Sequence, residues 1–275
     1  MSNAEFINAM RCAGLAPAKD VALPDGKLVR FRVEGDKAGS LNGWAVLHYQ
    51  PTLFGAFGSW KTGENHTWKA TTNETMTPAE REELRRKLNE AHQARLAEEA
   101  RVREVAAARA LKLWDGAKPA TNEHPYLTAK GVGAFGLRAL REQIMVPARD
   151  AEGRLHTIQF ISPNGDKRFL TGGRITGCYF AIGRPADVLL FAEGYATGAT
   201  LYQATGNAVA VCFNCGNLLP VARVLRAKFP RLRFVICADN DTGTPGNPGL
   251  KAAAAAAKAV GARVAYPVFE EVSNG

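Results

Sequence analysis

Two short apolar runs that each end on acidic residues constrain the fold of this 275-residue chain more than any other feature. Residues 188–192 (VLLFA) run directly into Glu193. Residues 234–238 (FVICA) run into Asp239 and, two residues later, Asp241. Both runs are rich in branched and aromatic side chains, which favours buried strands. Helical segments alternate with them and with further strand-like runs, so the sequence predicts a mainly parallel sheet with helices on both faces.

The alternation extends over residues 187–267. We expect strands at 188–192, 207–213, 233–238 and 263–267, and helices at 195–204, 216–228 and 248–260. Ligands of open α/β sheets bind beyond the carboxyl ends of the strands. Glu193, Asp239 and Asp241 should therefore gather at one edge, with the two aspartates on the same side of an extended segment.

Three carboxylates at one edge repel one another unless cations lie between them. Mg²⁺ or Mn²⁺ with oxygen ligands suits such a site, so we expect Glu193, Asp239 and Asp241 to bind a divalent cation. Gly194 lets the backbone turn tightly, and the loop at 243–249 opens a helix whose first amides suit a phosphate. The alternative is that these acids are ordinary caps at strand–helix turns.

The rest of the chain predicts three further segments. Residues 1–76 combine a short helical start with strand-like runs separated by Gly and Asn, which predicts a small β-rich domain. Thr77, Pro78 and Glu80 form the pattern of a capping box, and the charged residues that follow predict a solvated connector helix over 77–115. Residues 116–184 predict a small α+β unit, and residues 185–275 contain the parallel sheet.

The net charge of +9 is concentrated in one part of the chain. Residues 124–184 contain nine lysines and arginines against four acidic residues, a net charge of +5. A local basic surface attracts nucleic-acid phosphates through counterion release. A surface that only keeps the protein in solution is the alternative reading of the same charges.

These motifs resemble a known domain. The Glu-Gly pair after one strand and the D-x-D after another resemble the Toprim domain of bacterial-type primases, type IA and II topoisomerases and some nucleases. HPYLTAKGVGAFGL and IMVPARDAEGRLHTIQFISPNGDKRFLTGG resemble the basic subdomain before Toprim in bacterial replicative primases. GCYFAIG followed by FAEGYATGAT, and the N-terminal GWAVLHY and GAFGSWKTG, resemble plasmid- and phage-encoded primases more closely.

The resemblance implies roles for particular residues. Glu193, Asp239 and Asp241 would be the catalytic residues and the metal ligands, with Glu193 as the catalytic acid, acting as general base or metal ligand, and the two aspartates binding Mg²⁺. The residues that would bind template phosphates or an incoming triphosphate are Lys130, Lys167, Arg168, Arg174 and Gly194.

The sequence also departs from replicative primases. Thr197 stands where they have a further acid, which leaves the number of metal ions open. The N-terminal region offers only Cys12, His48 and His66, without the paired spacing of a zinc ribbon, so no zinc is expected. The helical subdomain and helicase-binding tail of those primases are not recognisable, and no P-loop pattern indicates a fused helicase motor.

The resemblance implies an enzyme, a nucleotidyltransferase that makes short primers on single-stranded DNA from nucleoside triphosphates during plasmid or phage replication. A replicative helicase or a longer parent protein would be its partner. A Toprim nuclease and a non-catalytic single-stranded-DNA-binding protein remain the alternatives. No apolar run is long enough to span a membrane, and the five cysteines are odd in number. We therefore expect reduced thiols, a cytoplasmic location and no membrane partner.

Overall fold

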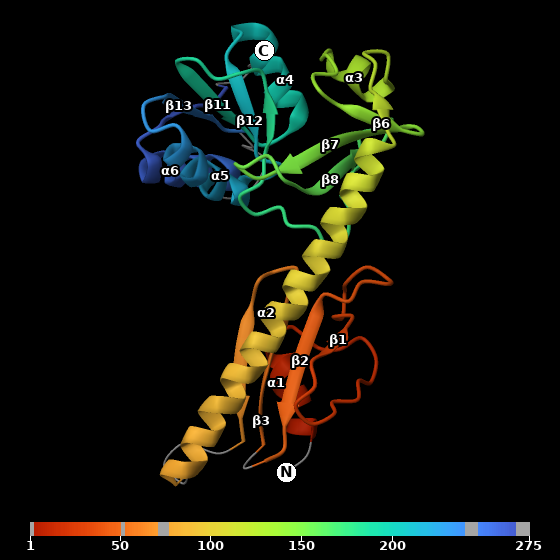
Figure 1. Ribbon diagram of the computed structural model, residues 1–275, viewed down its shortest axis with the longest axis vertical. Coiled ribbons are helices and arrows are strands. Elements are labelled where there is room, and N and C mark those ends of the chain that lie inside the picture. The colour runs from red at the N-terminus through yellow and green to blue at the C-terminus, as the bar shows by residue number, and fades with distance from the viewer. Residues whose placement is uncertain (1–2, 51–52, 71–76, 240–246, 268–275) are drawn as a thin grey trace, which may run out of the picture. The chain divides into compact units, whose positions relative to one another are not determined.

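The computed structural model describes residues 3–50, 53–70, 77–239 and 247–267. The chain divides into two compact units, Met1–Ala100 and Arg101–Gly275. The described residues form mixed α/β structure with one four-stranded sheet and two five-stranded sheets (Figure 1). Among them, no helix combines the length and the apolar character needed to cross a bilayer.

The first unit contains a four-stranded antiparallel meander and one short helix, as the sequence predicts. Its elements are α1 (Asn3–Cys12), β1 (Val29–Phe31), β2 (Gly43–His48), β3 (Phe54–Ser59) and β4 (Asn65–Lys69). Phe6 and Met10 of α1 are fully buried and pack in one cluster with Phe57. Trp44 and Phe54 are also almost fully buried, so these aromatic residues belong to the core.

The long helix α2 (Pro78–Asp115) contributes to the cores of both units. Most of its residues are exposed, as its charge predicts. In the first unit, however, Ala91 is buried and packs in one cluster with Trp44. In the second unit, Ala110 is fully buried and packs with Met145 and Ile158. The prediction of a solvated connector is therefore wrong at these positions, because short alanine side chains let neighbouring elements approach the helix closely.

The first sheet of the second unit is antiparallel, in the order β5-β6-β7-β8-β9. Its strands are β5 (Lys118–Pro119), β6 (Arg138–Leu140), β7 (Gln143–Arg149), β8 (Leu155–Ile161) and β9 (Lys167–Phe169). The short helix α3 (Pro125–Lys130) lies between β5 and β6 in the chain. It ends at Gly131, whose φ of 65° is left-handed, a conformation that glycine adopts readily at the end of a helix.

The second sheet has the order β10-β12-β11-β13-β14. Its strands are β10 (Phe180–Ile182), β11 (Val188–Ala192), β12 (Ala208–Val211), β13 (Arg233–Cys237) and β14 (Arg263–Ala265). Its helices are α4 (Tyr195–Thr205), α5 (Leu218–Lys228), which follows the 3-10 helix η2 (Cys215–Asn217), and α6 (Pro248–Val260). All pairings except the antiparallel β10–β12 pair are parallel, so the predicted mainly parallel order is confirmed.

Alternate residues of β11 pack on opposite faces of this sheet. Leu190 and Ala192 belong to a buried cluster with Tyr195 of α4. Leu189 and Phe191 belong to a second cluster with residues of α5 and α6. Figure 1 shows α5 and α6 together on one side of the strands and α4 on the other. This two-sided burial explains why β11 reads as a continuous apolar run.

One strand of the second sheet comes from the segment predicted to be the basic subdomain. β10 pairs with β12, and Arg149 at the end of β7 exchanges two backbone hydrogen bonds with Tyr179, of 3.0 and 2.8 Å. The two sheets of the second unit are therefore linked through main-chain pairing. The predicted boundary between residues 184 and 185 lies beyond β10, and it stays a prediction.

Candidate active site

Glu193 lies directly beyond the carboxyl end of β11, as predicted. It is followed by Gly194, the N-cap residue of α4, in extended conformation (φ −116°, ψ 158°). The carbonyl of Gly194 accepts a hydrogen bond of 3.0 Å from Gly198 N, which closes the first turn of the helix. Glu193 is half-buried, and its Oε1 atom is shielded from solvent. The strand and the helix thus hold this carboxylate at the edge of the sheet.

Asp239 reaches the same edge from the neighbouring strand. β11 and β13 are parallel, with Phe191 opposite Ile236, so both strands end at one edge. Asp239 follows β13 after Ala238, and it is exposed. Asp241 lies outside the described residues, so the predicted orientation of the aspartate pair stays a prediction.

Gly249 at the start of α6 connects these two acidic residues. A Cβ placed on Gly249 would lie 2.9 Å from Glu193 Oε1 and 3.0 Å from the backbone oxygen of Asp239. Both oxygens therefore face the same small space, and a side chain at this position would force one of them or the start of α6 to move. The sequence does not reveal this role, because its pattern indicates only that Gly249 belongs to the loop before a helix.

Lys167 of β9 approaches this edge from the other sheet. Its Nζ lies 3.6 Å from the position that a Cβ on Gly194 would occupy. Burial lowers the pKa of Lys167, the neighbouring charge of Lys130 lowers it further, and Asp239 acts in the opposite direction. The structure therefore brings Lys167 close to the acidic edge and Lys130 close to Lys167, and a phosphate-binding role would require such a pair of cations.

Arg168 has a different environment from Lys167, because successive residues of a strand point to opposite faces. Its Nη2 donates a hydrogen bond of 2.8 Å to Gln143 Oε1. Its guanidinium carbon lies 5.4 Å from the ring centroid of Phe160. The contacts of Arg168 are thus with its own sheet, and its predicted role in nucleic-acid binding stays a prediction.

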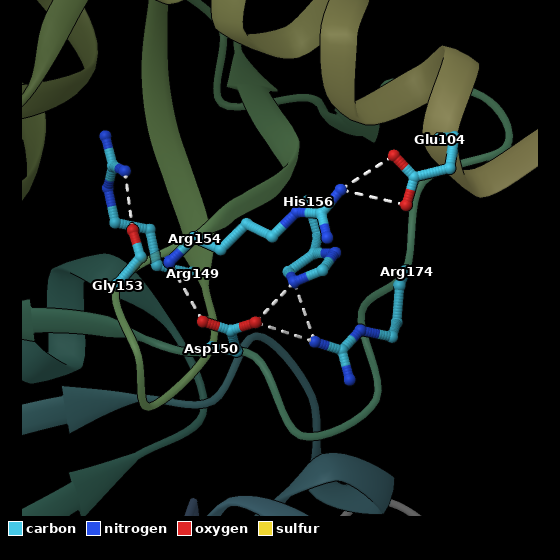
Figure 2. A network of polar contacts seen from close by, with 7 residues as sticks. All are labelled: Glu104, Arg149, Asp150, Gly153, Arg154, His156 and Arg174. Carbon is cyan, nitrogen blue, oxygen red and sulfur yellow. Dashed lines mark hydrogen bonds and ion pairs between the residues drawn. The ribbon is translucent and has the colours of Figure 1, made fainter.

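Arg174 belongs to a network of polar contacts around Asp150 (Figure 2). Its Nη2 lies 3.1 Å from Asp150 Oδ2 and 2.7 Å from His156 Nε2, and His156 Nε2 lies 2.6 Å from the same Oδ2. Burial alone would raise the pKa of Asp150, but hydrogen bonds from His156 and the Arg154 amide, and the charge of Arg174, lower it. The predicted role of Arg174 in binding nucleic acid stays a prediction.

The same network extends to α2. Arg154 Nη2 donates to both carboxylate oxygens of Glu104, at 2.8 and 2.7 Å (Figure 2). Next to this pair, Gly172 has a φ of 85°, and a Cβ on it would lie 2.9 Å from Val102 Cγ1. The network thus fixes the turns of α2 that belong to the second unit.

Cysteine and tyrosine side chains near the edge are built into the core. Cys212 is fully buried, and burial together with the nearby charge of Glu193 raises its pKa. Burial raises the pKa of Cys237 to about 11. Tyr195 is fully buried, and its hydroxyl donates to Gly133 O at 2.6 Å and accepts from Phe135 N at 2.9 Å. The environment of these three side chains is therefore structural.

Phe213 is a residue of this edge that the sequence analysis missed. It follows β12, and its φ is 72°. A bulky residue rarely adopts this left-handed conformation, which costs on the order of 1–3 kcal/mol. Apart from the asparagines that follow and favour a turn, the sequence carries no signal of this conformation.

The donor set suits a divalent cation. Glu193 Oε1 and the backbone oxygen of Asp239 face one space, and carboxylate and carbonyl oxygens are ligands that Mg²⁺ prefers. Within the described ranges, no three His, Cys, Asp or Glu residues group as a metal site. The third predicted ligand, Asp241, is outside those ranges.

The geometry defines an α/β protein with acidic and basic groups at one sheet edge, and sequence comparison supplies its relatives. No family model matches the chain. Over 98% of its length it is 36% identical to a DNA primase TraC of Escherichia coli (286 residues) and 35% identical to a second one (283 residues). These alignments cover 20% and 26% of the two relatives, so the chain spans about a fifth to a quarter of their length. The predicted resemblance to DNA primases is confirmed.

Solved structures also resemble the chain in part. The primase fragment of the bacteriophage T7 primase-helicase protein is 13% identical, and the match covers 56% of this chain and 71% of that one, with a TM-score of 0.40. The DnaG catalytic core is 20% identical, and its match covers 47% of this chain and 46% of its own, with a TM-score of 0.34.

Proposed function

We propose that this chain is the catalytic segment of a primase that makes short oligonucleotide primers on single-stranded DNA for plasmid or phage replication. The observation that carries the proposal is the meeting of Glu193, Asp239 and Lys167 at one sheet edge, in a chain that aligns with DNA primases over 98% of its length. In this proposal the sheet of β10–β14 is a Toprim domain. The sheet of β5–β9 is the basic subdomain that supplies the phosphate-binding side chains.

Glu193, Asp239 and Asp241 would hold the divalent cations. When bound, Mg²⁺ or Mn²⁺ would activate the primer 3′-hydroxyl and neutralise the leaving pyrophosphate. Glu193 is suited to a fixed position, because β11, α4 and the start of α6 surround it. Asp239 is exposed, so it is accessible to a ligand arriving from solvent.

Lys130 and Lys167 would bind the phosphates of the template or of the incoming nucleoside triphosphate. Their mutual repulsion contributes to the lowered pKa of Lys167, and a polyphosphate anion between them would relieve it. The backbone of Gly194 would approach the same phosphates. Arg168 and Arg174 are further proposed contacts with nucleic acid. Arg168 already donates a hydrogen bond to Gln143, and Arg174 to Asp150, so a phosphate would bind beside these partners or replace them.

The partners follow from this activity. Single-stranded DNA and nucleoside triphosphates are the proposed substrates. The greater length of both DNA primase relatives supports a longer parent protein, and a replicative helicase is the proposed functional partner.

The proposal is tested by incubating the chain with single-stranded DNA, labelled nucleoside triphosphates and Mg²⁺ and resolving the products by length. We expect short labelled oligomers that require template and metal and disappear in Asp239→Asn. Asp187→Asn is the matched control, because Asp187 is an exposed acid before the opposite end of β11. Degradation of the DNA without nucleotides would indicate a nuclease instead. DNA binding without any product would indicate a binding protein.

A further inference from the structure

Two half-buried aromatic residues lie together beside the acidic edge. Phe213 follows β12, and Phe169 is the last residue of β9. Their rings are T-shaped, with centroids 5.4 Å apart. This aromatic pair joins the carboxyl end of the parallel sheet to the strand that carries Lys167.

The backbone around Phe213 is held in place by asparagine side chains. Asn217 is buried, and its Nδ2 donates hydrogen bonds of 2.9 Å to the carbonyls of Cys212 and Cys178. Asn214 Oδ1 accepts from Asn217 N at 3.0 Å. These bonds fix the chain on both sides of Phe213, which explains how the left-handed conformation persists. Glycine would adopt this conformation without strain, so the backbone alone does not account for an aromatic residue here.

The aromatic pair is next to the groups proposed to bind phosphate and metal. Cys212, the neighbour of Phe213, donates its amide to Ala192 O at 2.8 Å, one residue before Glu193. On β9, Phe169 is two residues from Lys167, and such residues point to the same face of a strand. An aromatic surface beside a cation and a carboxylate edge matches the chemistry of a nucleotide, which combines a flat base with phosphates.

We propose that Phe213, supported by Phe169, stacks on a nucleobase whose phosphates lie at the Lys167–Glu193 edge. Aromatic rings accept any base because every base has a flat face. The base belongs either to the single-stranded template or to the incoming nucleotide. The proposal deepens the primase function and rests on it, but base stacking can be measured without polymerisation.

The test compares Phe213→Leu and Phe213→Tyr with wild type. One measurement is the affinity for fluorescent single-stranded DNA without nucleotides, by anisotropy. The other is the KM for nucleoside triphosphate in primer synthesis. Loss of one stacked base should weaken binding roughly 5- to 150-fold in Phe213→Leu, whereas Phe213→Tyr should retain most of it. Phe135→Leu is the matched control, because Phe135 is also half-buried and T-shaped against an aromatic residue, Tyr202.

Each outcome decides the proposal. Weaker DNA binding in Phe213→Leu supports stacking on the template, and a raised KM with unchanged DNA binding supports stacking on the incoming nucleotide. Unchanged values in both measurements, an equal loss in Phe135→Leu, or a Phe213→Tyr variant as weak as the leucine variant would overturn it. Phe213 and Phe135 both pack against the buried cluster that contains Val211, so we expect the melting temperature of Phe213→Leu to fall no more than that of Phe135→Leu, and a larger fall would overturn the proposal. If wild type makes no primers but Phe213→Leu still weakens DNA binding, the primase proposal fails and the stacking proposal stands.

Discussion

Replacing Gly249 by alanine tests the geometry of the acidic edge with a single methyl group. The new Cβ would lie 2.9 Å from Glu193 Oε1 and 3.0 Å from the Asp239 carbonyl oxygen, where ordinary contacts begin at 3.4 Å. Either the start of α6 or the Glu193 carboxylate must therefore move. A shift of roughly 0.5 Å is large beside Mg–O distances of about 2.0–2.1 Å in a near-ideal octahedron.

We expect Gly249→Ala to lower kcat/KM for primer synthesis by about 10-fold, because a displacement of about 1 Å at a reacting centre can cost on the order of 100-fold. The Mg²⁺ concentration for half-maximal activity should rise as well. The fold should be little affected, since alanine in a helix gains about 0.4–1 kcal/mol from the unfolded state, which offsets part of the clash. The assay is a Mg²⁺ titration of primer synthesis, with a thermal melt of each protein.

Gly116→Ala is the matched control. The nearest atom to its new Cβ would be Lys112 O at 3.5 Å, an ordinary contact. It should keep the wild-type Mg²⁺ dependence. If Gly249→Ala also kept wild-type kcat/KM and Mg²⁺ dependence, the inference that Glu193 and Asp239 hold the metal beside α6 would be refuted.

Three further predictions concern charge and packing in the second unit. Lys167→Gln should make the plot of log affinity for single-stranded DNA against log salt concentration less steep, by about 1 in slope. Arg168→Gln should change this slope less. Anisotropy titrations at several salt concentrations would measure both slopes. Asp150→Asn should lower the free energy of unfolding at pH 7 by about 1–3 kcal/mol. The pKa of Asp150 is lower in the folded protein than in the unfolded chain, so ionised Asp150 stabilises the fold fully above the ordinary carboxyl pKa. This stabilisation is lost as the pH falls through the pKa that Asp150 has in the folded protein. The difference in free energy of unfolding between wild type and Asp150→Asn, measured in urea, should therefore shrink below about pH 4. Tyr195→Phe should lower the free energy of unfolding by about 1–3 kcal/mol, because the carbonyl of Gly133 loses its hydrogen-bond donor. An unchanged free energy of unfolding in urea would contradict this.

The second sheet could be predicted because each element carries a local signal. The apolar runs of β11 and β13 stop at acids, and Pro248 marks the start of α6 as expected. Parallel strands end at one edge, so the common location of Glu193 and Asp239 also follows from the pattern.

The features that the sequence could not reveal depend on tertiary packing. Gly249 faces Glu193 only because α6 packs back onto the sheet, and Lys167 arrives from a different sheet. Ala110 of α2 is buried although alanine contributes little to an apolar pattern. Phe213 is held in its left-handed conformation by hydrogen bonds from the buried side chain of Asn217. Asn217 lies outside strand β12, so the pattern of the strand does not reveal this effect.

In the proposed function, metal-dependent primer synthesis requires the Glu193 carboxylate at the end of β11. The most direct test is Glu193→Gln, which keeps the shape of the side chain and removes its charge. We predict that the variant loses template- and Mg²⁺-dependent primer synthesis while its melting temperature and its affinity for single-stranded DNA stay close to wild type. Primer synthesis at the wild-type rate in Glu193→Gln would contradict the account.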